Sequence, residues 1–378
     1  MRTVLFVFCA LFGAWSFSQS DIRVLGELPE SLVESSGLLF YNGNLITHND
    51  SGGEARLYEL DTTSLAVVRT VSLSNQGNID WEDLAQDDDY IYIGDFGNNN
   101  GSRRDLAILR IAKTDYNASD TVAAERIEFA YGDQLDFSGS ENSDFDAEAL
   151  IVLGDDLIVL TKQWQQLGTV AYRIPKTPGT FVAERIGAFP INGLVTAATF
   201  DAASNTLYLL GYSQLLVPFF ATFTDVTSNA LFDGQFTKTD LNIVPAQMEA
   251  LALIGPRFYA TSEAFVNAPI IDTAARLFSF GLDGMDGEGP QPGPEPEVPQ
   301  ESLVVFKTFG ATQLGYVLNT DKAIIAMGIY DASGRLVRYV PLEAITDNDI
   351  DISDLQQSLY YLAFLLPDGI LSAPFFRD

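Results

Sequence analysis

The chain has 378 residues, 47% of them hydrophobic, and a mean hydropathy of +0.10, which suits a globular protein and argues against an integral membrane protein. Its 51 acidic side chains outnumber 21 basic ones and give a formal net charge of −30 at pH 7. A field of this sign repels phosphate backbones and anionic lipids, so nucleic-acid binding is not expected. Solubility or the attraction of cations is the expected role of the charge.

Residues 1–18 have the pattern of an export signal that is removed from the mature protein. Arg2 supplies the positive start, and the apolar stretch 4–15 is too short to remain as a membrane span. Small residues at Ser16 and Ser18 predict cleavage after Ser18 and a secreted or outer-cell-surface location. The only cysteine, Cys9, lies inside this segment, so the mature chain is expected to have no disulfide and no cysteine metal site.

Residues 19–283 contain a repeated pattern of apolar strands with a period of about 50 residues. The first strand of each unit begins at an acidic or small polar residue, and these strands cover 34–38, 80–84, 146–150, 193–196 and 247–251. The second strands cover 44–50, 90–95, 157–162, 207–212 and 257–263. The alternation and the β-branched and aromatic content predict an all-β propeller of five four-stranded blades, with six blades left open.

The fifth unit has only three strands, whereas residues 21–28 form a spare strand ahead of the first unit. Pairing the two would close the ring and remove two exposed sheet edges. The stretch 132–145 is predicted to be a longer polar loop between the second and third units.

Two further regions follow the propeller. Residues 284–300, rich in proline and glycine, have the composition of an extended linker. Residues 301–378 hold about seven short strands, the number expected for a small immunoglobulin-like β-sandwich.

The tail resembles the sorting domain of the type IX secretion system of Bacteroidetes-type bacteria. The resemblance rests on 328–337, a strand, an Asp-x-x-Gly turn and a second strand, and on the later run 350–360. The tail departs from that family at Ser358, where glycine is usual, and in lacking a basic end. The resemblance implies that the type IX machinery is a partner, that the protein crosses the outer membrane, and that the tail is then removed.

The body resembles a group of secreted bacterial propellers without an established activity. The shared phrases are 47–53 (THNDSGG), 80–84 (DWEDL) and 94–100 (GDFGNNN). It is more distantly similar to phytase-like and lactonase-like propeller hydrolases, a likeness of fold and acidity only.

Candidate site residues follow from the repeat itself. In a propeller the start of each first strand and the end of each second strand meet at one rim, so residues distant in sequence converge there. The first strands contribute Glu34, Asp80, Glu82, Asp83, Asp146, Glu148 and Glu249. The second strands contribute His48, Asp50, Asp95, Asn98, Lys162, Gln163, Tyr212 and Glu263.

Carboxylates gathered in this way repel one another unless a hard cation lies among them or one holds a proton. Calcium is the expected cofactor, with Glu82, Asp83, Glu148 and Glu249 as its predicted ligands, because calcium takes six to eight oxygen ligands. Zinc is not expected, since His48 is the only histidine. A structural interpretation stays open, in which the repeated acids accept backbone N–H bonds and join adjacent blades. A Ser36–His48–Asp50 triad is sterically possible, but nothing in the sequence specifies it.

Three functions remain open at this point. The first is a secreted or surface propeller that binds an unknown small-molecule or surface ligand through an acidic, cation-assisted mouth. The second is a calcium-dependent hydrolase of phosphoester or lactone substrates in which a metal-bound water is the nucleophile. The third is a structural or adhesive surface module.

Overall fold

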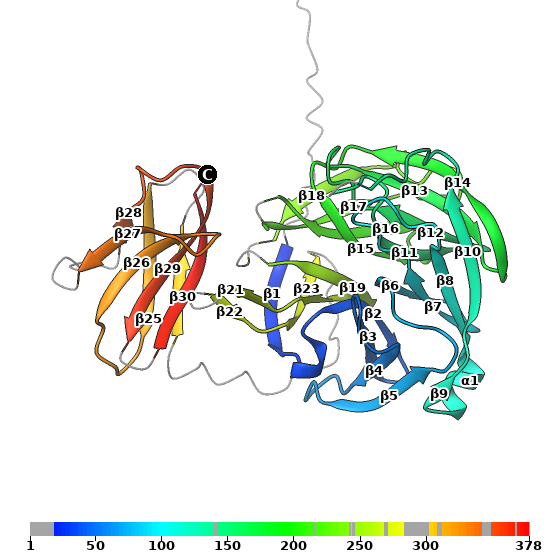
Figure 1. Ribbon diagram of the computed structural model, residues 1–378, viewed down its shortest axis with the longest axis horizontal. Helices are drawn as coiled ribbons and strands as arrows, with labels where there is room; N and C mark the ends of the chain where they lie inside the picture. The colour runs from blue at the N-terminus through cyan, green and yellow to red at the C-terminus, as the bar shows by residue number, and fades with distance from the viewer. Residues whose placement is uncertain are drawn as a thin grey trace, which may run out of the picture.

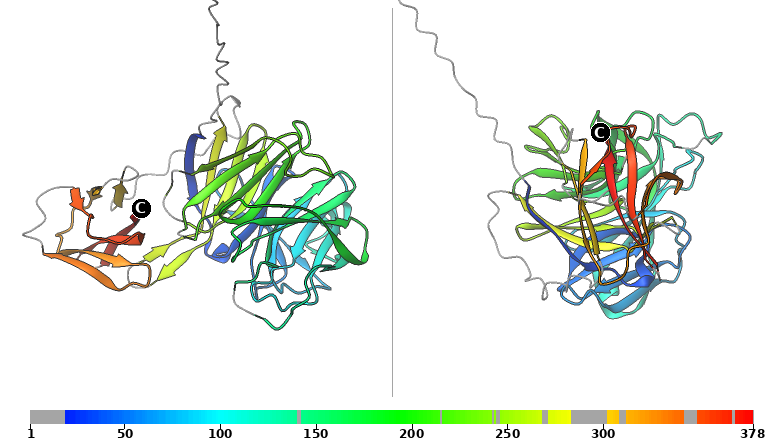
Figure 2. Two further views of the ribbon diagram at one scale, coloured as in Figure 1. Left: turned by 90° about the horizontal axis from the view of Figure 1, so that it is seen from above. Right: turned by 90° about the vertical axis from the view of Figure 1, so that its left-hand side faces the viewer.

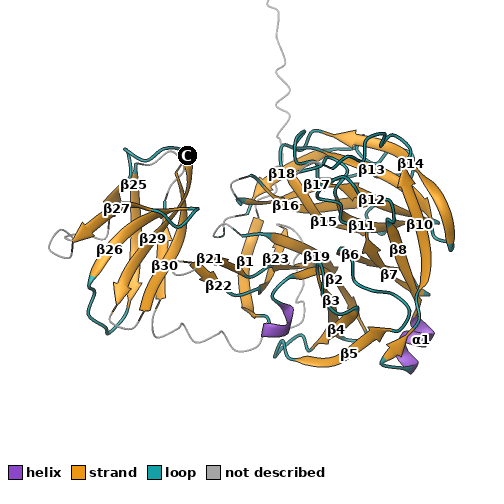
Figure 3. Ribbon diagram, viewed as in Figure 1, coloured by secondary structure: helices purple, strands orange, loops and turns teal. Residues whose placement is uncertain are grey.

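The computed structural model describes residues 19–139, 142–214, 216–241, 243, 246–267, 271–282, 302–307, 312–341, 349–366 and 369–377. Strands dominate both parts of the molecule, a ring of sheets and a smaller sandwich beside it (Figures 1 and 3). The predicted export signal and linker lie outside the described residues. No helix in the described ranges has the length and apolar character needed to cross a bilayer.

The ring is a five-bladed β-propeller, as the sequence predicted. Blade 1 contains β2 (Ser35–Tyr41), β3 (Asn44–Asn49), β4 (Arg56–Leu60) and β5 (Val67–Leu73). Blade 2 contains β6 (Trp81–Gln86), β7 (Tyr90–Asp95), β8 (Ala107–Ala112) and β10 (Glu125–Tyr131). Blade 3 contains β11 (Ala147–Leu153), β12 (Asp156–Thr161), β13 (Thr169–Pro175) and β14 (Gly179–Phe189). Blade 4 contains β15 (Leu194–Asp201), β16 (Thr206–Tyr212), β17 (Pro218–Phe223) and β18 (Phe236–Asp240).

Blade 5 closes the ring with strands from both ends of the propeller. It contains β19 (Met248–Ile254), β20 (Arg257–Ser262), β23 (Arg276–Leu282) and β1 (Gln19–Glu27). β1 runs antiparallel to β23, with Arg23 opposite Ser279 and Glu27 opposite Arg276. Each inner strand, β2, β6, β11, β15 or β19, lies against the inner strands of the two neighbouring blades. The predicted closure by the N-terminal strand is therefore confirmed.

Several features of the ring were not predicted. β10 pairs in parallel with β14, so blades 2 and 3 share one eight-stranded sheet. The short helix α1 (Lys113–Ala118) leads into β9 (Thr121–Val122), which adds a fifth strand to blade 1. A hairpin of β21 (Phe265–Asn267) and β22 (Ile271–Thr273) interrupts blade 5.

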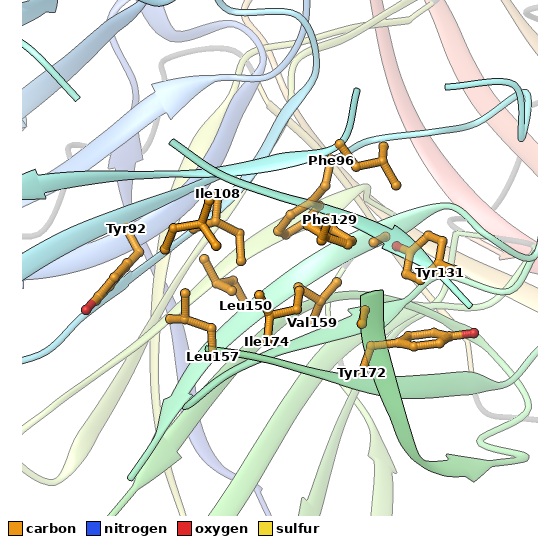
Figure 4. Packing of buried hydrophobic residues seen from close by; sticks show 14 of the residues in the cluster. Tyr92, Phe96, Ile108, Phe129, Tyr131, Leu150, Leu157, Val159, Tyr172 and Ile174 are labelled. Carbon is orange, nitrogen blue, oxygen red and sulfur yellow. The ribbon is translucent and has the colours of Figure 1, made fainter. Parts of the chain in front are cut away.

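The apolar core lies between the blades, because alternate side chains of each strand face one neighbouring blade or the other. Between blades 2 and 3, Tyr92, Ile108 and Phe129 pack against Leu157 and Tyr172 (Figure 4). Five such clusters follow one another around the ring, so packing rather than covalent links stabilises the body.

The C-terminal part is a two-sheet sandwich of seven described strands, as predicted. One sheet contains β24 (Ser302–Phe306), β25 (Gln313–Asn319) and β28 (Asp349–Asp351). The other contains β27 (Leu336–Pro341), β26 (Ala326–Asp331), β29 (Ser358–Leu366) and β30 (Gly369–Arg377). Leu314 and Tyr316 of the first sheet pack with Ile329 and Phe364 of the second. The outer face of β29 contacts Leu216 of the propeller, so the sandwich lies against the ring (Figures 1 and 2).

Candidate functional site

A β-bulge near the start of every inner strand shapes one end of the central channel. The pairing with the second strand of the blade shifts between Ser36 and Leu38 in blade 1 and between Trp81 and Leu84 in blade 2. Equivalent shifts occur in blades 3, 4 and 5. A bulge redirects the side chains that it contains. The residues within the five bulges are Gly37, Glu82 with Asp83, Glu148, Thr196 and Glu249.

Three of the side chains at or beside these bulges fasten the blades to one another. The Ser36 hydroxyl donates to the Glu82 carbonyl at 2.5 Å, and the Thr196 hydroxyl donates to the Met248 carbonyl at 2.5 Å. Asp83 accepts the backbone N–H groups of Leu84 and Leu150, each at 2.8 Å, and also that of Ala198. Asp83 therefore joins blade 2 to blades 3 and 4 at the channel axis. The Asp83 contacts match the structural interpretation of the repeated acids, whereas Ser36 and Thr196 join blades by donating to carbonyls.

A separate group of carboxylates, which we call the acidic mouth, gathers above this level. It consists of Asp50, Asp80, Glu82, Asp146, Glu148, Glu249 and Glu263. Within it, oxygens of Asp50, Asp80 and Glu82 lie within 4.8 Å of one another, a spacing that could hold a metal ion. A second set, Glu82, Asp146 and Glu148, has the same property and shares Glu82 with the first.

The two sets differ in how far the protein already occupies their oxygens. In the second set, Asp146 accepts the Asn98 N–H at 2.7 Å and the Trp164 indole N–H at 2.9 Å. Glu148 accepts the Lys162 ammonium at 2.9 Å. Asp50, which belongs to the first set alone, has a buried Oδ1 without a hydrogen-bond partner, and so does Oε1 of Glu82, which the two sets share.

Glu82 is buried, with 2% of its surface accessible. Its Oε1 lies over Gly97, where an added Cβ would come within 1.9 Å of that oxygen, so only glycine leaves room for it. A buried oxygen without a donor costs free energy unless a ligand satisfies it. The free oxygens of Glu82 and Asp50 could be satisfied by an ion at the first set.

The electrostatics of the mouth agree with this inference. Burial, reinforced by the neighbouring carboxylates, raises the pKa of Asp50 to about 9. Burial also raises the pKa of Asp146, Glu148, Glu249 and Glu263 to about 7, although the Lys162 charge lowers each of them. The pKa of Glu82 is raised well above its usual range by burial and by Asp50 and Glu148. Without a cation, some of these groups hold protons near neutral pH.

Lys162 and Tyr212 are the non-acidic side chains that contact the glutamates of the mouth. The Lys162 ammonium lies 4.8 Å from the Trp164 ring centroid and 5.3 Å from that of Tyr212. The Tyr212 hydroxyl donates to Glu249 Oε1 at 3.0 Å, while Glu249 Oε2 stays buried without a partner. Trp164 therefore contacts Lys162 and Asp146 at the mouth, whereas Trp81 is fully buried between blades.

Other predicted site residues lie near the mouth but are occupied by the protein. Asp95 pairs with Arg103 at 3.0 Å, and Asn98 donates to the Phe145 carbonyl and accepts the Arg103 N–H. Glu34 is exposed, and its carbonyl accepts the Asp50 N–H. Asp83, predicted as a metal ligand, is occupied by backbone donors because the bulge turns it away from its neighbour Glu82.

His48 is fully buried and does not form a triad with Ser36 and Asp50. Its Nδ1 lies 2.9 Å from the Asn49 carbonyl, and its ring packs edge-on against Trp81 at 5.5 Å. Burial lowers the pKa of His48 to about 4, so the ring is neutral at neutral pH. The Ser36 hydroxyl is bound to a carbonyl, as described above.

The opposite end of the channel has a different character. A cavity of about 420 Å³ lies there, lined by residues from the inner strands of all five blades. Its lining includes no charged residue, and its polar side chains are Gln86 and Thr199. Gln86 donates to the Phe40 carbonyl at 2.8 Å. Asp83 lies on the axis between this cavity and the acidic mouth.

No protein-family profile and no curated protein matches this sequence. Among solved structures, the chain is similar to the PQQ-bound aldose sugar dehydrogenase of Streptomyces coelicolor at 10% identity and a TM-score of 0.38, covering 70% of this chain and 98% of that one. A glucose dehydrogenase gives 10% identity and a TM-score of 0.39, with 69% and 99% covered. PhoX of Pseudomonas fluorescens, in complex with vanadate, gives 11% identity and a TM-score of 0.38, with 61% and 58% covered. Similarities of this degree carry no assignment of activity.

Proposed function

We propose that this protein is an exported β-propeller whose acidic mouth binds a hard divalent cation and, through that cation, an oxygen-bearing ligand. The observation that carries the proposal is the set of Asp50, Asp80 and Glu82, whose oxygens lie within 4.8 Å of one another. Asp50 and Glu82 each have one buried oxygen without a hydrogen-bond donor, and a cation bound between these residues would satisfy them.

Calcium is the cation that the donor set favours. Every acidic ligand of the mouth offers oxygen, the only histidine is bound to a backbone carbonyl, and the mature chain is predicted to lack cysteine. Oxygen-only sites suit calcium, magnesium or manganese rather than zinc. Ligands from separate blades form a wide and adaptable site, which suits the larger calcium ion. Asp83, an earlier candidate ligand, has no part in this site.

Calorimetric titration of the metal-free protein with calcium tests the proposal. We expect saturable binding and an increase in melting temperature, and the Glu82→Gln variant should lose both. A matched control is Glu59→Gln, because Glu59 is also a buried glutamate, 5% exposed, but pairs with Arg69 far from the mouth. Absence of calcium binding by the unaltered protein, or equal binding by the Glu82→Gln variant, would contradict the proposal.

Export itself is a second part of the proposal and rests on the sequence of both ends. The apolar leader supports passage across the inner membrane, and the C-terminal sandwich with its Asp-x-x-Gly turn supports passage through a type IX machinery. In the structure, Asp331 accepts the Ser333 and Arg335 backbone N–H groups, which is the expected geometry of that turn. Mass spectrometry of the protein recovered outside the cell should find Gln19 as its first residue and the tail removed. An intact leader or tail on that protein would contradict export by this route.

A further inference from the structure

The second set of carboxylates, Glu82, Asp146 and Glu148, has the spacing of a metal site but already contains a positive charge. The Lys162 ammonium lies 2.9 Å from Glu148 Oε1, and only 5% of the residue is exposed. Its charge acts on each of Asp146, Glu148, Glu249 and Glu263 and lowers the pKa of all four. Lys162 is thus the counter-ion that these four carboxyl groups share.

The position of this ammonium is fixed by the protein. The backbone N–H of Lys162 donates to the Asp146 carbonyl at 2.8 Å, directly after β12 ends at Thr161. The rings of Trp164 and Tyr212 flank the ammonium at cation–π distances. A lysine ammonium is a compact point charge with three donors, and it can take the place of a metal ion among carboxylates.

The first set contains no such internal cation. Arg103 acts on Asp80 from a distance, but it is engaged with Asp95, Asp105 and the Gly97 carbonyl. Oxygens without a donor remain on Asp50, Glu82 and Glu249, whereas Asp146 and Glu148 accept hydrogen bonds from Trp164 and Lys162. The two sets are adjacent positions for positive charge that share Glu82, and the Lys162 ammonium lies in the second of them.

We propose that the Lys162 ammonium occupies the second cation position of the acidic mouth and restricts the mouth to a single metal ion. This inference rests on the proposed function, since it concerns the same mouth. On this inference, Lys162 determines how many metal ions the mouth binds. Replacing the ammonium by an uncharged side chain of similar length should open a second position on Glu82, Asp146 and Glu148.

Calorimetric titration with calcium chloride, together with metal analysis after dialysis, measures the stoichiometry. We expect one calcium ion on the unaltered protein and two on the Lys162→Met variant. The matched control is Lys176→Met, which removes a lysine paired with Asp87 at 3.0 Å outside the mouth and should leave one ion bound.

The Lys162→Met variant leaves buried carboxylates without their counter-ion, so a second measurement covers the case in which it folds only with calcium present. In that case the dependence of its unfolding free energy on calcium concentration provides the number of ions taken up on folding. The same stoichiometry in the variant as in the unaltered protein, whether one ion or two, would overturn this inference alone. No calcium on the unaltered protein would overturn the proposed function, and this inference with it.

Discussion

The two ends of the propeller channel are built from the same five inner strands but differ sharply in chemistry. At one end the bulges direct Glu82, Glu148 and Glu249 toward one another. At the other end the same strands line a cavity of about 420 Å³ without a charged side chain. Asp83 separates the two by accepting backbone donors from three blades.

This difference shows how a ring of equivalent strands obtains one specialised end. Regular inner strands place their side chains between the blades and leave mainly backbone along the channel. A bulge interrupts that alternation and adds one residue, whose side chain reaches the axis. Three of these bulges supply Glu82, Glu148 and Glu249 to the acidic end of the channel, and the uncharged end is the regular state of the same strands.

The largest expected effect comes from pH, which should act on the acidic end alone. Asp146, Glu148, Glu249 and Glu263 have a folded-state pKa of about 7, above their ordinary values, so the folded protein holds more protons than the unfolded chain between about pH 4 and about pH 7. Their stabilising contribution is present at low pH and is lost as the pH rises through that window.

We therefore expect the metal-free protein to lose about 3 kcal/mol or more of unfolding free energy between about pH 5 and about pH 8, which is the contribution of a single carboxyl shifted to this extent. His48, with a folded pKa of about 4, acts in the opposite direction but is a single group. Urea unfolding at both values, with and without millimolar calcium, measures the effect. Calcium should remove most of the loss, and a metal-free protein equally stable at both values would contradict the account.

The next effect concerns the barrier between the two ends. Asp83→Ala should lower the unfolding free energy by about 2–3 kcal/mol, because it leaves buried backbone N–H groups without an acceptor. Asp83→Asn keeps one acceptor oxygen and should cost less. Urea unfolding of both variants measures the difference. A loss below about 1 kcal/mol for the alanine variant would mean that water replaces the carboxylate on the axis.

A smaller and more selective effect is expected at Asp50. Because burial raises its pKa to about 9, Asp50 is protonated in the metal-free protein at neutral pH, and Asp50→Asn should leave the stability of that form almost unchanged. The same variant loses a metal ligand, so calcium affinity should fall roughly tenfold. Calorimetry and thermal melting measure the two quantities. Unaltered calcium affinity would remove Asp50 from the cation site.

The smallest effect is expected at the uncharged end. Gln86→Leu removes the hydrogen bond to the Phe40 carbonyl and should cost about 1 kcal/mol of unfolding free energy. Its calcium-induced increase in melting temperature should equal that of the unaltered protein. An altered calcium response would show that the two ends are coupled through the channel, in conflict with the barrier at Asp83.

The sequence was sufficient for the propeller, its closing strand and the gathering of acids at one rim, because each follows from a repeated pattern, and it favoured five blades while leaving six open. The roles of adjacent residues were not predictable. Glu82 and Asp83 stand side by side in Asp80-Trp81-Glu82-Asp83-Leu84, yet one faces the mouth and the other binds backbone amides. That outcome depends on a bulge, which leaves no mark in a single sequence.

The same limit explains the remaining site residues. His48 and Asp50 are alternate residues, which suggested a shared direction, but β3 ends at Asn49 and the alternation stops there. Asp95 was placed correctly at the end of β7, but its partner Arg103 comes from the following loop. Gly97, which makes room for Glu82, lies in the phrase 94–100, and nothing in that phrase indicates the close approach of the Glu82 carboxylate.

The pairing of β1 with β23 bears on how the chain is made. The first and last strands of the ring are separated by nearly the whole propeller sequence, so blade 5 stays incomplete until residues 276–282 have been synthesised. Until then the nascent ring carries unpaired edges on both sides of the gap, and such edges attract other strands. Contacts this distant in sequence also form slowly. Assembly of the ring, and of the acidic mouth with it, therefore waits for synthesis of its final strand.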